Sequence, residues 1–147
     1  LLKLCERWRV PRDCKELAEV VAREHGHVHR CADLSAPATL RLLERCDAIR
    51  RPERFVEFLQ ACECDARGRL HFEQAPYPQA TRLQTALDAA LAVATAPIAA
   101  RVSEEVKQQG GDLRRLGPMI ALAIEQARSA AIAQALNPAQ RDTPVSA

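Results

Sequence analysis

Two histidines, His25 and His29, lie four residues apart in a stretch that has the apolar periodicity of a helix. Residues at this spacing share one face of a helix, and two imidazoles placed there can chelate one divalent metal ion. The alternative is that His25, which lies on the apolar stripe, is a buried histidine bonded within the protein, and the spacing alone favours this alternative. No carboxylate directly follows His25, because the next residue is Gly26. The pair is therefore incomplete as a metal site.

Arginines near the two ends of one predicted helix form a second candidate site. They are Arg50, Arg51, Arg54, Arg67 and Arg69. A guanidinium group suits bidentate contacts with phosphate, although a GC-rich genome also raises the arginine content. The same charges fit the dipole of a helix over residues 53–66, with Glu53 at its start and Arg67 and Arg69 at its end. Acidic residues of this stretch nearly cancel the arginines, so the spacing alone favours a structural role.

Helices must position both groups. Alanine and leucine supply much of the apolar content, and aromatic residues make up only 3% of the chain. Such a composition favours helix and offers little β-branched material for a sheet. We therefore predict an all-α fold, an irregular bundle of about six to seven helices without strands. The expected helical segments are 1–9, 12–29, 36–49, 53–66, 79–94, 97–109 and 118–137. Ser35 is expected to cap the third of these, with Pro37 in its first turn.

The segment 53–66 has the clearest pattern among these helices. Its apolar residues recur at helical spacing and are Phe55, Phe58, Leu59, Cys62 and Ala66. Gly68 is expected to end the helix. In the loop that follows, we expect Phe72 and Tyr77 to anchor the loop to the core rather than to stack on bases.

The length, charge and cysteines limit the class of protein. The net charge of the 147 residues is +2, which by itself implies no partner. The spacing of the six cysteines matches no disulfide framework and no paired zinc motif, so we expect reduced cysteines and a cytoplasmic location. No window approaches the roughly 18 apolar residues of a membrane span, and no signal peptide is recognisable. The first residues look like a helix entered partway, so we expect a fragment of a longer protein.

Three short motifs stand out between residues 50 and 79. They read Arg-Arg-Pro-Glu-Arg-Phe at 50–55, Cys-Glu-x-Asp-x-Arg-Gly-Arg at 62–69 and Tyr-Pro-Gln at 77–79. On these motifs, the chain from about residue 4 to 135 resembles the C-terminal part of the bacterial multifunctional CCA-adding tRNA nucleotidyltransferases.

The resemblance implies a division of the chain. Residues 1–49 resemble the end of an HD-type metal-dependent phosphohydrolase module, in which Leu-Ala-x-x-Val-x-x-x-His-x-x-x-His matches residues 17–29. Relatives often have Asp where this chain has Gly26, and the earlier ligands of such a module are absent. Residues 50–138 resemble the helical tail that holds the tRNA elbow. Residues 139–147 are expected to fray.

The function implied by the resemblance is to position tRNA while a catalytic domain in the missing N-terminal half adds CCA from CTP and ATP. That parent enzyme would use Mg²⁺, whereas this chain alone is expected to be inactive, with an empty HD-type metal site. Arg114 and Arg115 join the five arginines above as candidates for phosphate contacts, because structured RNA is held by its backbone and shape. We expect no membrane partner, and the chain could form a homodimer.

Two other functions remain open. One is an HD-type phosphohydrolase, a phosphatase or cyclic phosphodiesterase, that uses His25 and His29 as metal ligands. The other is a non-catalytic helical interaction domain. Bound metal would favour the first, whereas the second would bind neither metal nor tRNA.

Overall fold

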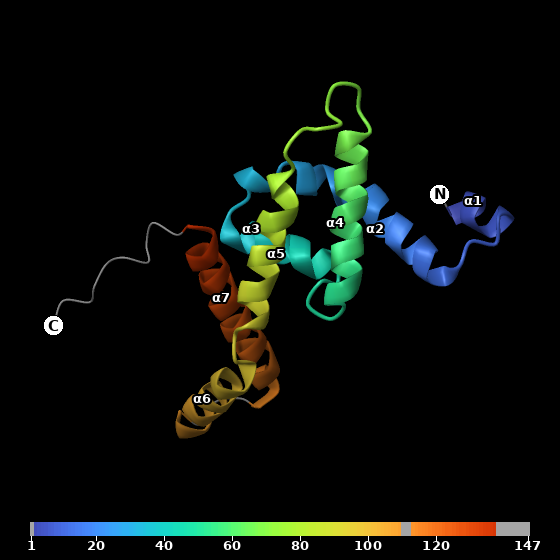
Figure 1. Cartoon of the computed structure of the whole chain (residues 1–147). Helices are drawn as coiled ribbons and strands as arrows, with labels where there is room; N and C mark the ends of the chain where they lie inside the picture. The colour runs from blue at the N-terminus through green and yellow to red at the C-terminus, as the bar shows by residue number, and fades with distance from the viewer. Residues whose placement is uncertain (1, 110–112, 138–147) are drawn as a thin grey trace.

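The computed structural model describes residues 2–109 and 113–137, and these residues form helices connected by loops without a strand (Figure 1). The helices are α1 (Leu2–Arg7), α2 (Arg12–His29), α3 (Ala36–Arg45), α4 (Pro52–Arg67), α5 (Pro78–Leu91), α6 (Thr95–Gln108) and α7 (Leu116–Leu136), with short 3-10 helices η1 (Cys31–Asp33) and η2 (Leu113–Arg115). The predicted all-α class is therefore confirmed. The expected frayed tail, 139–147, lies outside the described residues.

The core lies where α3, α4, α5 and α7 meet. Phe55, Phe58, Leu59 and Cys62 of α4 are buried, so the predicted apolar stripe of this helix faces the core. The rings of Phe55 and Phe58 stack with their centroids 5.7 Å apart. The facing helix α5 contributes four buried residues, which are Leu83, Ala86, Leu87 and Ala90. Burying such side chains removes apolar surface from water, which is the main stabilising term of the fold.

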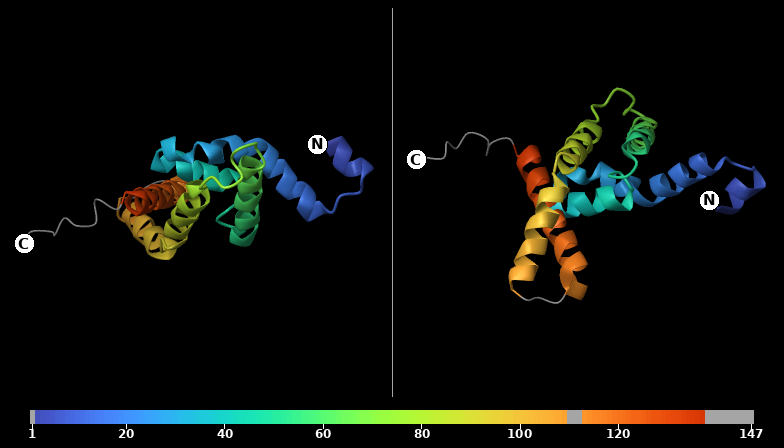
Figure 2. Two further views of the ribbon diagram at one scale, coloured as in Figure 1. Left: turned by 45° about the horizontal axis from the view of Figure 1, so that its top comes forward. Right: turned by 90° about the horizontal axis from the view of Figure 1, so that it is seen from below.

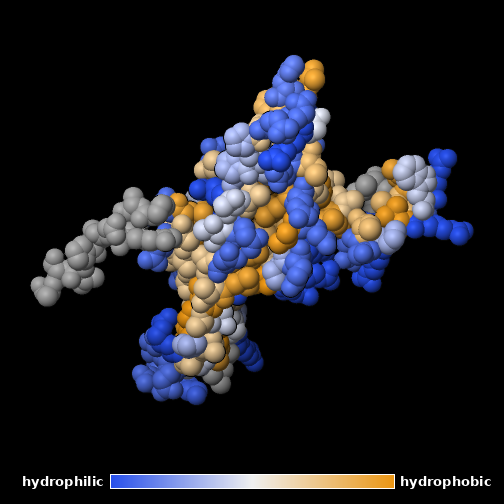
Figure 3. Space-filling model, viewed as in Figure 1, coloured by the Kyte–Doolittle hydropathy of each residue, from blue (hydrophilic) through white to orange (hydrophobic). Residues whose placement is uncertain are grey.

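The helices form a central cluster with projections on several sides (Figures 1 and 2). Helix α2 packs against α4 and extends to one side toward α1. Helices α6 and α7 form an antiparallel hairpin that projects from the cluster, and α7 returns to pack on α5 and α3. The loop between α4 and α5 projects at the opposite end from this hairpin. Apolar surface gathers between α4 and α5, whereas the far end of the α6–α7 hairpin is polar (Figure 3).

Helix α3 ends earlier than expected. The prediction continued it to residue 49, but it stops at Arg45, because Asp47 adopts a left-handed backbone conformation with φ of 55°. The N–H of Asp47 donates to the carbonyl of Glu44, and the N–H of Ala48 donates to that of Leu43, each at 2.9 Å. This is the Schellman arrangement, which satisfies the last carbonyls of a helix. Aspartate tolerates the left-handed region better than most residues do.

The start of α3 agrees with expectation. The hydroxyl of Ser35 accepts a hydrogen bond from the N–H of Ala38 at 3.4 Å, and Pro37 lies in the first turn. Ser35 therefore caps the helix as predicted.

Among the described residues, no single helix is long and apolar enough to cross a membrane. Helices α5 and α6 meet that length and composition only when they are taken together, and a 48° bend separates them.

The described cysteines are free thiols. Burial raises the pKa of Cys46 and of Cys62 to about 12. These two thiols are therefore protonated near neutral pH and behave as small apolar side chains.

Candidate nucleic-acid interface

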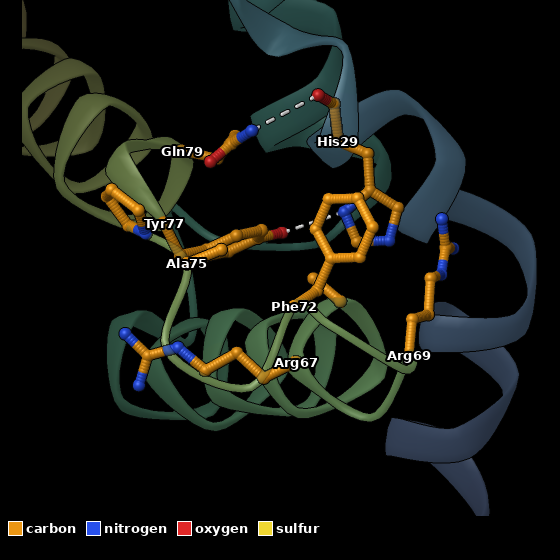
Figure 4. Close-up of a pocket in the computed structure, with 9 residues that line it drawn as sticks. His29, Arg67, Arg69, Phe72, Ala75, Tyr77 and Gln79 are labelled. Atoms are coloured by element: carbon orange, nitrogen blue, oxygen red, sulfur yellow. Dashed lines mark hydrogen bonds between the residues drawn. The ribbon is translucent and has the colours of Figure 1, made fainter.

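His29, the last residue of α2, joins three elements that the sequence separates. Its Nε2 donates a hydrogen bond to Oδ2 of Asp65 on α4 at 3.0 Å, and its Nδ1 accepts one from the hydroxyl of Tyr77 at 3.0 Å. This tautomer follows from the network, since an ionised carboxylate can only accept. The backbone carbonyl of His29 also accepts a hydrogen bond from Nε2 of Gln79 at 3.4 Å (Figure 4). The ring thus ties the end of α2 to α4 and to the start of α5.

The protonation of the two partners agrees with this arrangement. The hydrogen bond from His29 lowers the pKa of Asp65, and Arg69 acts in the same direction. Burial raises the pKa of Tyr77. Near neutral pH, Asp65 is therefore an anionic acceptor and Tyr77 a neutral donor, as the two hydrogen bonds require.

The two candidate metal ligands do not form a ligand set. Nδ1 of His25 donates to the backbone carbonyl of Val21 at 2.9 Å, and both ring nitrogens of His29 have protein partners. The two imidazole rings meet edge to face with centroids 5.7 Å apart. In the parts of the chain that the structure describes, no three His, Cys, Asp or Glu side chains converge to hold a metal ion. The residues present therefore do not fit the metal site of an HD-type module.

A cavity of about 250 Å³ lies beside this hydrogen-bonded histidine. It is enclosed by the end of α4, the loop 68–77, the start of α5 and His29, a region that we call the α4–α5 corner (Figure 4). Its lining residues are His29, Ala66, Arg67, Arg69, Phe72, Ala75, Pro76, Tyr77 and Gln79. Two of the three motifs that carry the resemblance, those at 62–69 and 77–79, contribute Asp65, Arg67, Arg69, Tyr77 and Gln79 to this one region.

Two arginines of the predicted set lie at the rim of the cavity. Arg67 pairs with Glu63 at 2.9 Å, and Arg69 pairs with Asp65 at 3.4 Å. Each partner lies one turn earlier on α4, and the arginine side chains are 47% and 63% exposed. Exposed pairs of this kind contribute little to stability. Both guanidinium groups are therefore accessible to a phosphate.

The two aromatic residues of the loop differ from each other. Tyr77 packs against the core, as expected. The same expectation is wrong for Phe72, which is 56% exposed. The chain turns away from the core through His71, whose φ of 72° is left-handed. Phe72 therefore lies at the mouth of the cavity.

Three other arginines of the predicted set, Arg50, Arg51 and Arg54, lie where the chain bends between α3 and α4. We call this region, residues 46–51 together with Arg54, the α3–α4 bend. Arg51 binds Glu16 of α2 at 2.9 Å and Asp47 at 3.5 Å. Arg54 reaches the same two carboxylates at 3.4 and 3.5 Å, and its side chain is only 19% exposed. Arg50 is 80% exposed and lies 3.7 Å from Asp47. The bend thus uses its arginines mainly within the protein.

Glu16 and Asp47 illustrate how this network forms. Hydrogen bonds from Arg12 and Arg51 lower the pKa of Glu16. Asp47 occupies the left-handed position that ends α3, which turns its carboxylate toward the start of α4.

The last two predicted residues, Arg114 and Arg115, are exposed at the end of η2 beside the start of α7. They lie on the hairpin, at the opposite end of the molecule from the α4–α5 corner (Figure 1).

The sequence interpretation missed a buried carboxylate between α2 and α3. Glu24 is 2% exposed, and its oxygens accept hydrogen bonds from Arg45 at 3.0 to 3.1 Å and from Arg23 at 3.0 Å. Burial acts to raise the pKa of Glu24, but the hydrogen bonds from the two arginines outweigh it, so the pKa lies below its usual value. Nothing in the sequence marks Glu24, because its main partner lies 21 residues away.

The contacts of His29 were also missed, although a signal existed. His29, Asp65 and Tyr77 each belong to a different motif of the resemblance. Separate motifs that share a resemblance are candidates for contact in space. Periodicity alone could not pair them, because it describes one helix at a time.

Comparison with curated proteins gives consistent matches. The chain is 63% identical over 101 residues to the multifunctional CCA protein of Paracidovorax citrulli, 54% over 130 residues to that of Variovorax paradoxus and 50% over 145 residues to that of an Acidovorax species. These matches cover 69%, 88% and 98% of this chain but only 24%, 29% and 32% of the relatives.

Neither of the other comparisons adds a relative. No family model matches the chain, and no solved structure does. The matching part is the C-terminal part of the curated relatives, of which the chain spans less than a third. The chain therefore belongs to the multifunctional CCA protein family, over the C-terminal part of its members.

Proposed function

We propose that this chain binds tRNA and positions it for CCA addition at the 3′ end by a catalytic domain in a longer polypeptide, which would take CTP and ATP as substrates. The observation that carries the proposal is the α4–α5 corner. There, residues from the motifs at 62–69 and 77–79 meet His29 around a cavity with two accessible arginines and an exposed aromatic ring. Contacts to phosphate and sugar fix the register and orientation of a bound nucleic acid, which is the task that positioning requires.

The likeness to multifunctional CCA proteins supports this choice. A family name that refers to CCA agrees with the resemblance to CCA-adding tRNA nucleotidyltransferases. The described residues offer phosphate ligands but no group of three or more His, Cys, Asp or Glu side chains that could hold a metal ion. We therefore assign to the chain a binding role and to the rest of the longer polypeptide the nucleotidyl transfer with its Mg²⁺.

The arginines at the two regions are expected to differ as RNA ligands. Arg67 and Arg69 each pair with a carboxylate four residues earlier in the chain, so exchanging this carboxylate for a phosphate leaves the packing of the helices unchanged. Arg51 and Arg54 hold α2 against the start of α4, so the same exchange would weaken the fold. We therefore place the main phosphate contacts at Arg67 and Arg69, with Arg50, Arg114 and Arg115 as secondary contacts.

A filter-binding titration of the chain with tRNA at several salt concentrations tests this function. Each phosphate contact releases counterions, so the logarithm of the association constant should fall linearly with the logarithm of salt concentration, by about 0.7 to 0.9 per contact. Arg101→Ala is the control for the loss of Arg67. Arg101 is an exposed arginine of α6 that pairs with Glu105 at 2.8 Å, as Arg67 pairs with Glu63. Absence of binding, or binding that ignores salt, would refute the proposal.

Metal analysis and sedimentation separate the alternatives. A stoichiometric transition metal in the purified chain would favour a phosphohydrolase site at His25 and His29. Binding of this metal would require these histidines to give up the hydrogen bonds described above. Sedimentation equilibrium would show whether the chain forms a homodimer, which remains a prediction. The cytoplasmic location also remains a prediction.

A further inference from the structure

We infer that the cavity of the α4–α5 corner binds one unstacked nucleotide of an RNA chain, with the base between Phe72 and Tyr77 and the phosphate at Arg67 and Arg69. The inference deepens the proposed function, on which it rests. It goes beyond that function because it names a single base-binding site rather than a phosphate-binding surface.

The size of the cavity limits its ligand. Pockets for drug-sized molecules have volumes of roughly 300 to 1,000 Å³, whereas this one has about 250 Å³. A single planar ring system fits this volume, and a folded RNA element does not. Since RNA is read mainly where unstacked bases can turn outward, a cavity for one ring system suits one such base.

The inner wall of the cavity is held in place before any ligand arrives. The hydroxyl of Tyr77 is bonded to His29, which is bonded to Asp65, so the tyrosine ring is tied to α2 and α4 through two hydrogen bonds of 3.0 Å. The rings of His29 and Tyr77 meet edge to face with centroids 5.9 Å apart. A preorganised aromatic wall lowers the entropic cost of binding a base against it.

The outer side of the cavity combines an aromatic ring with positive charge. Phe72 is more than half exposed, although burial of a phenylalanine would be favourable. Arg67, the last residue of α4, and Arg69, two residues beyond it, line the same cavity (Figure 4). An exposed aromatic face beside arginines is the combination with which proteins bind single-stranded nucleic acid, because every base has a stacking face and every nucleotide a phosphate.

An unsatisfied acceptor in the cavity wall also indicates a ligand. Nε2 of Gln79 donates to the carbonyl of His29, but its buried Oε1 has no hydrogen-bond partner among the described residues. Buried polar atoms without a partner are uncommon in folded proteins. A base with an exocyclic amino group would supply the missing donor after a small rotation of this side chain.

The single tyrosine of the chain provides a direct test. With ring-¹³C tyrosine, the NMR spectrum contains one tyrosine ring, Tyr77, which lies in the cavity wall. Titration with the four nucleoside 5′-monophosphates at millimolar concentrations should shift this signal in a saturable manner. Ribose 5-phosphate should not shift it. No shift with any nucleotide, or an equal shift with ribose 5-phosphate, would overturn the assignment of a base site whether or not the chain binds tRNA.

A competition arm distinguishes a nucleotide within RNA from a free nucleotide. If an RNA base occupies the cavity, saturating tRNA should abolish the shift caused by the mononucleotide. If tRNA binds and the mononucleotide still shifts Tyr77 to the same extent, the ligand is a free nucleotide and our inference is wrong. Failure of tRNA to bind at all would instead refute the proposed function, which the salt titration detects separately.

Two matched variants complete the test. Phe72→Ala should weaken tRNA binding about tenfold, within the range for loss of one base–aromatic stack, and should leave the salt dependence unchanged. Leu70→Ala is the control, because Leu70 belongs to the same loop, is 75% exposed and does not line the cavity. Equal affinities of the two variants would overturn the inference, and circular dichroism would verify that both are folded.

Discussion

Arginines gather at two places on this molecule, the α3–α4 bend and the α4–α5 corner. The two places differ in where the carboxylate partners of these arginines lie. At the bend, Arg54 reaches Glu16 of a different helix and is only 19% exposed. At the corner, Arg69, which lies just beyond α4, pairs with Asp65 four residues earlier and is 63% exposed. A pair between helices stabilises the packing of those helices, whereas an exposed pair between residues four apart in the chain contributes little. The residue type is thus the same, but Arg67 and Arg69 can exchange their partners for a ligand without loss of helix packing, whereas Arg54 cannot.

The same contrast extends to Glu24, which joins α2 to Arg45 at the end of α3. Glu24→Ala should lower the free energy of unfolding by about 3 kcal/mol, at the low end of the range for breaking a buried pair. The low end applies because Arg45 is 44% exposed and can regain water. Urea denaturation measures this loss. Glu57→Ala on the exposed side of α4 is the control and should change stability by less than about 0.5 kcal/mol.

Two double variants compare the regions directly. Arg67→Ala with Arg69→Ala should weaken tRNA binding about tenfold and reduce the slope of the salt dependence by about two, with little loss of stability. Arg51→Ala with Arg54→Ala should instead destabilise the fold by about 1 kcal/mol and change the affinity less. Filter binding and urea denaturation of both proteins provide the two measurements. The reverse pattern would mean that the bend, and not the corner, is the RNA-binding region.

The pH dependence of stability provides a further comparison. Because the pKa of Glu24 in the folded protein lies below its usual value of 4.5, the stability that this carboxylate contributes is complete above about pH 4.5. That stability is lost as pH falls through the lowered pKa. The free energy of unfolding should therefore decrease more steeply below pH 4.5 in the wild type than in Glu24→Gln, which has no charge to lose. Parallel curves for the two proteins would show that Glu24 contributes no pH-dependent stability.

The smallest effect is expected within the corner. Tyr77→Phe removes the hydroxyl that donates to His29 and should lower the free energy of unfolding by about 1 kcal/mol, the usual contribution of one hydrogen bond. Phe72→Ala, in the same cavity, should cost less, because this ring is already more than half exposed. If Phe72→Ala were the more destabilising of the two, the cavity mouth would be part of the core.

Sequence reasoning succeeded where one helix was sufficient for the argument. The stripe of Phe55, Phe58, Leu59 and Cys62 and the cap at Ser35 depend on residues within a few positions of each other. It failed at the end of α3, where the periodic pattern continues but Asp47 turns into the left-handed region. It failed for Phe72 as well, because burial of a loop residue depends on the direction in which the loop leaves the core.

The candidate site divides in the same way. The sequence offered seven arginines and two histidines as candidates, and the resemblance linked the motifs, but neither indicated which arginines pair with carboxylates of another helix. His29 lies 36 residues from Asp65 and 48 residues from Tyr77 along the chain. Such partners are brought together by the packing of helices and not by local spacing.

The amino-acid sequence by itself determined the helical class, the apolar face of α4 and the supply of arginines, because helix propensity and periodicity act over a few neighbouring residues. Only the tertiary structure decided how each charge is used. Packing brought Glu16 and Asp47 to the arginines of the bend and left those of the corner open beside a cavity. Electrostatic pairing depends on distance and exposure in space, and helix packing sets both.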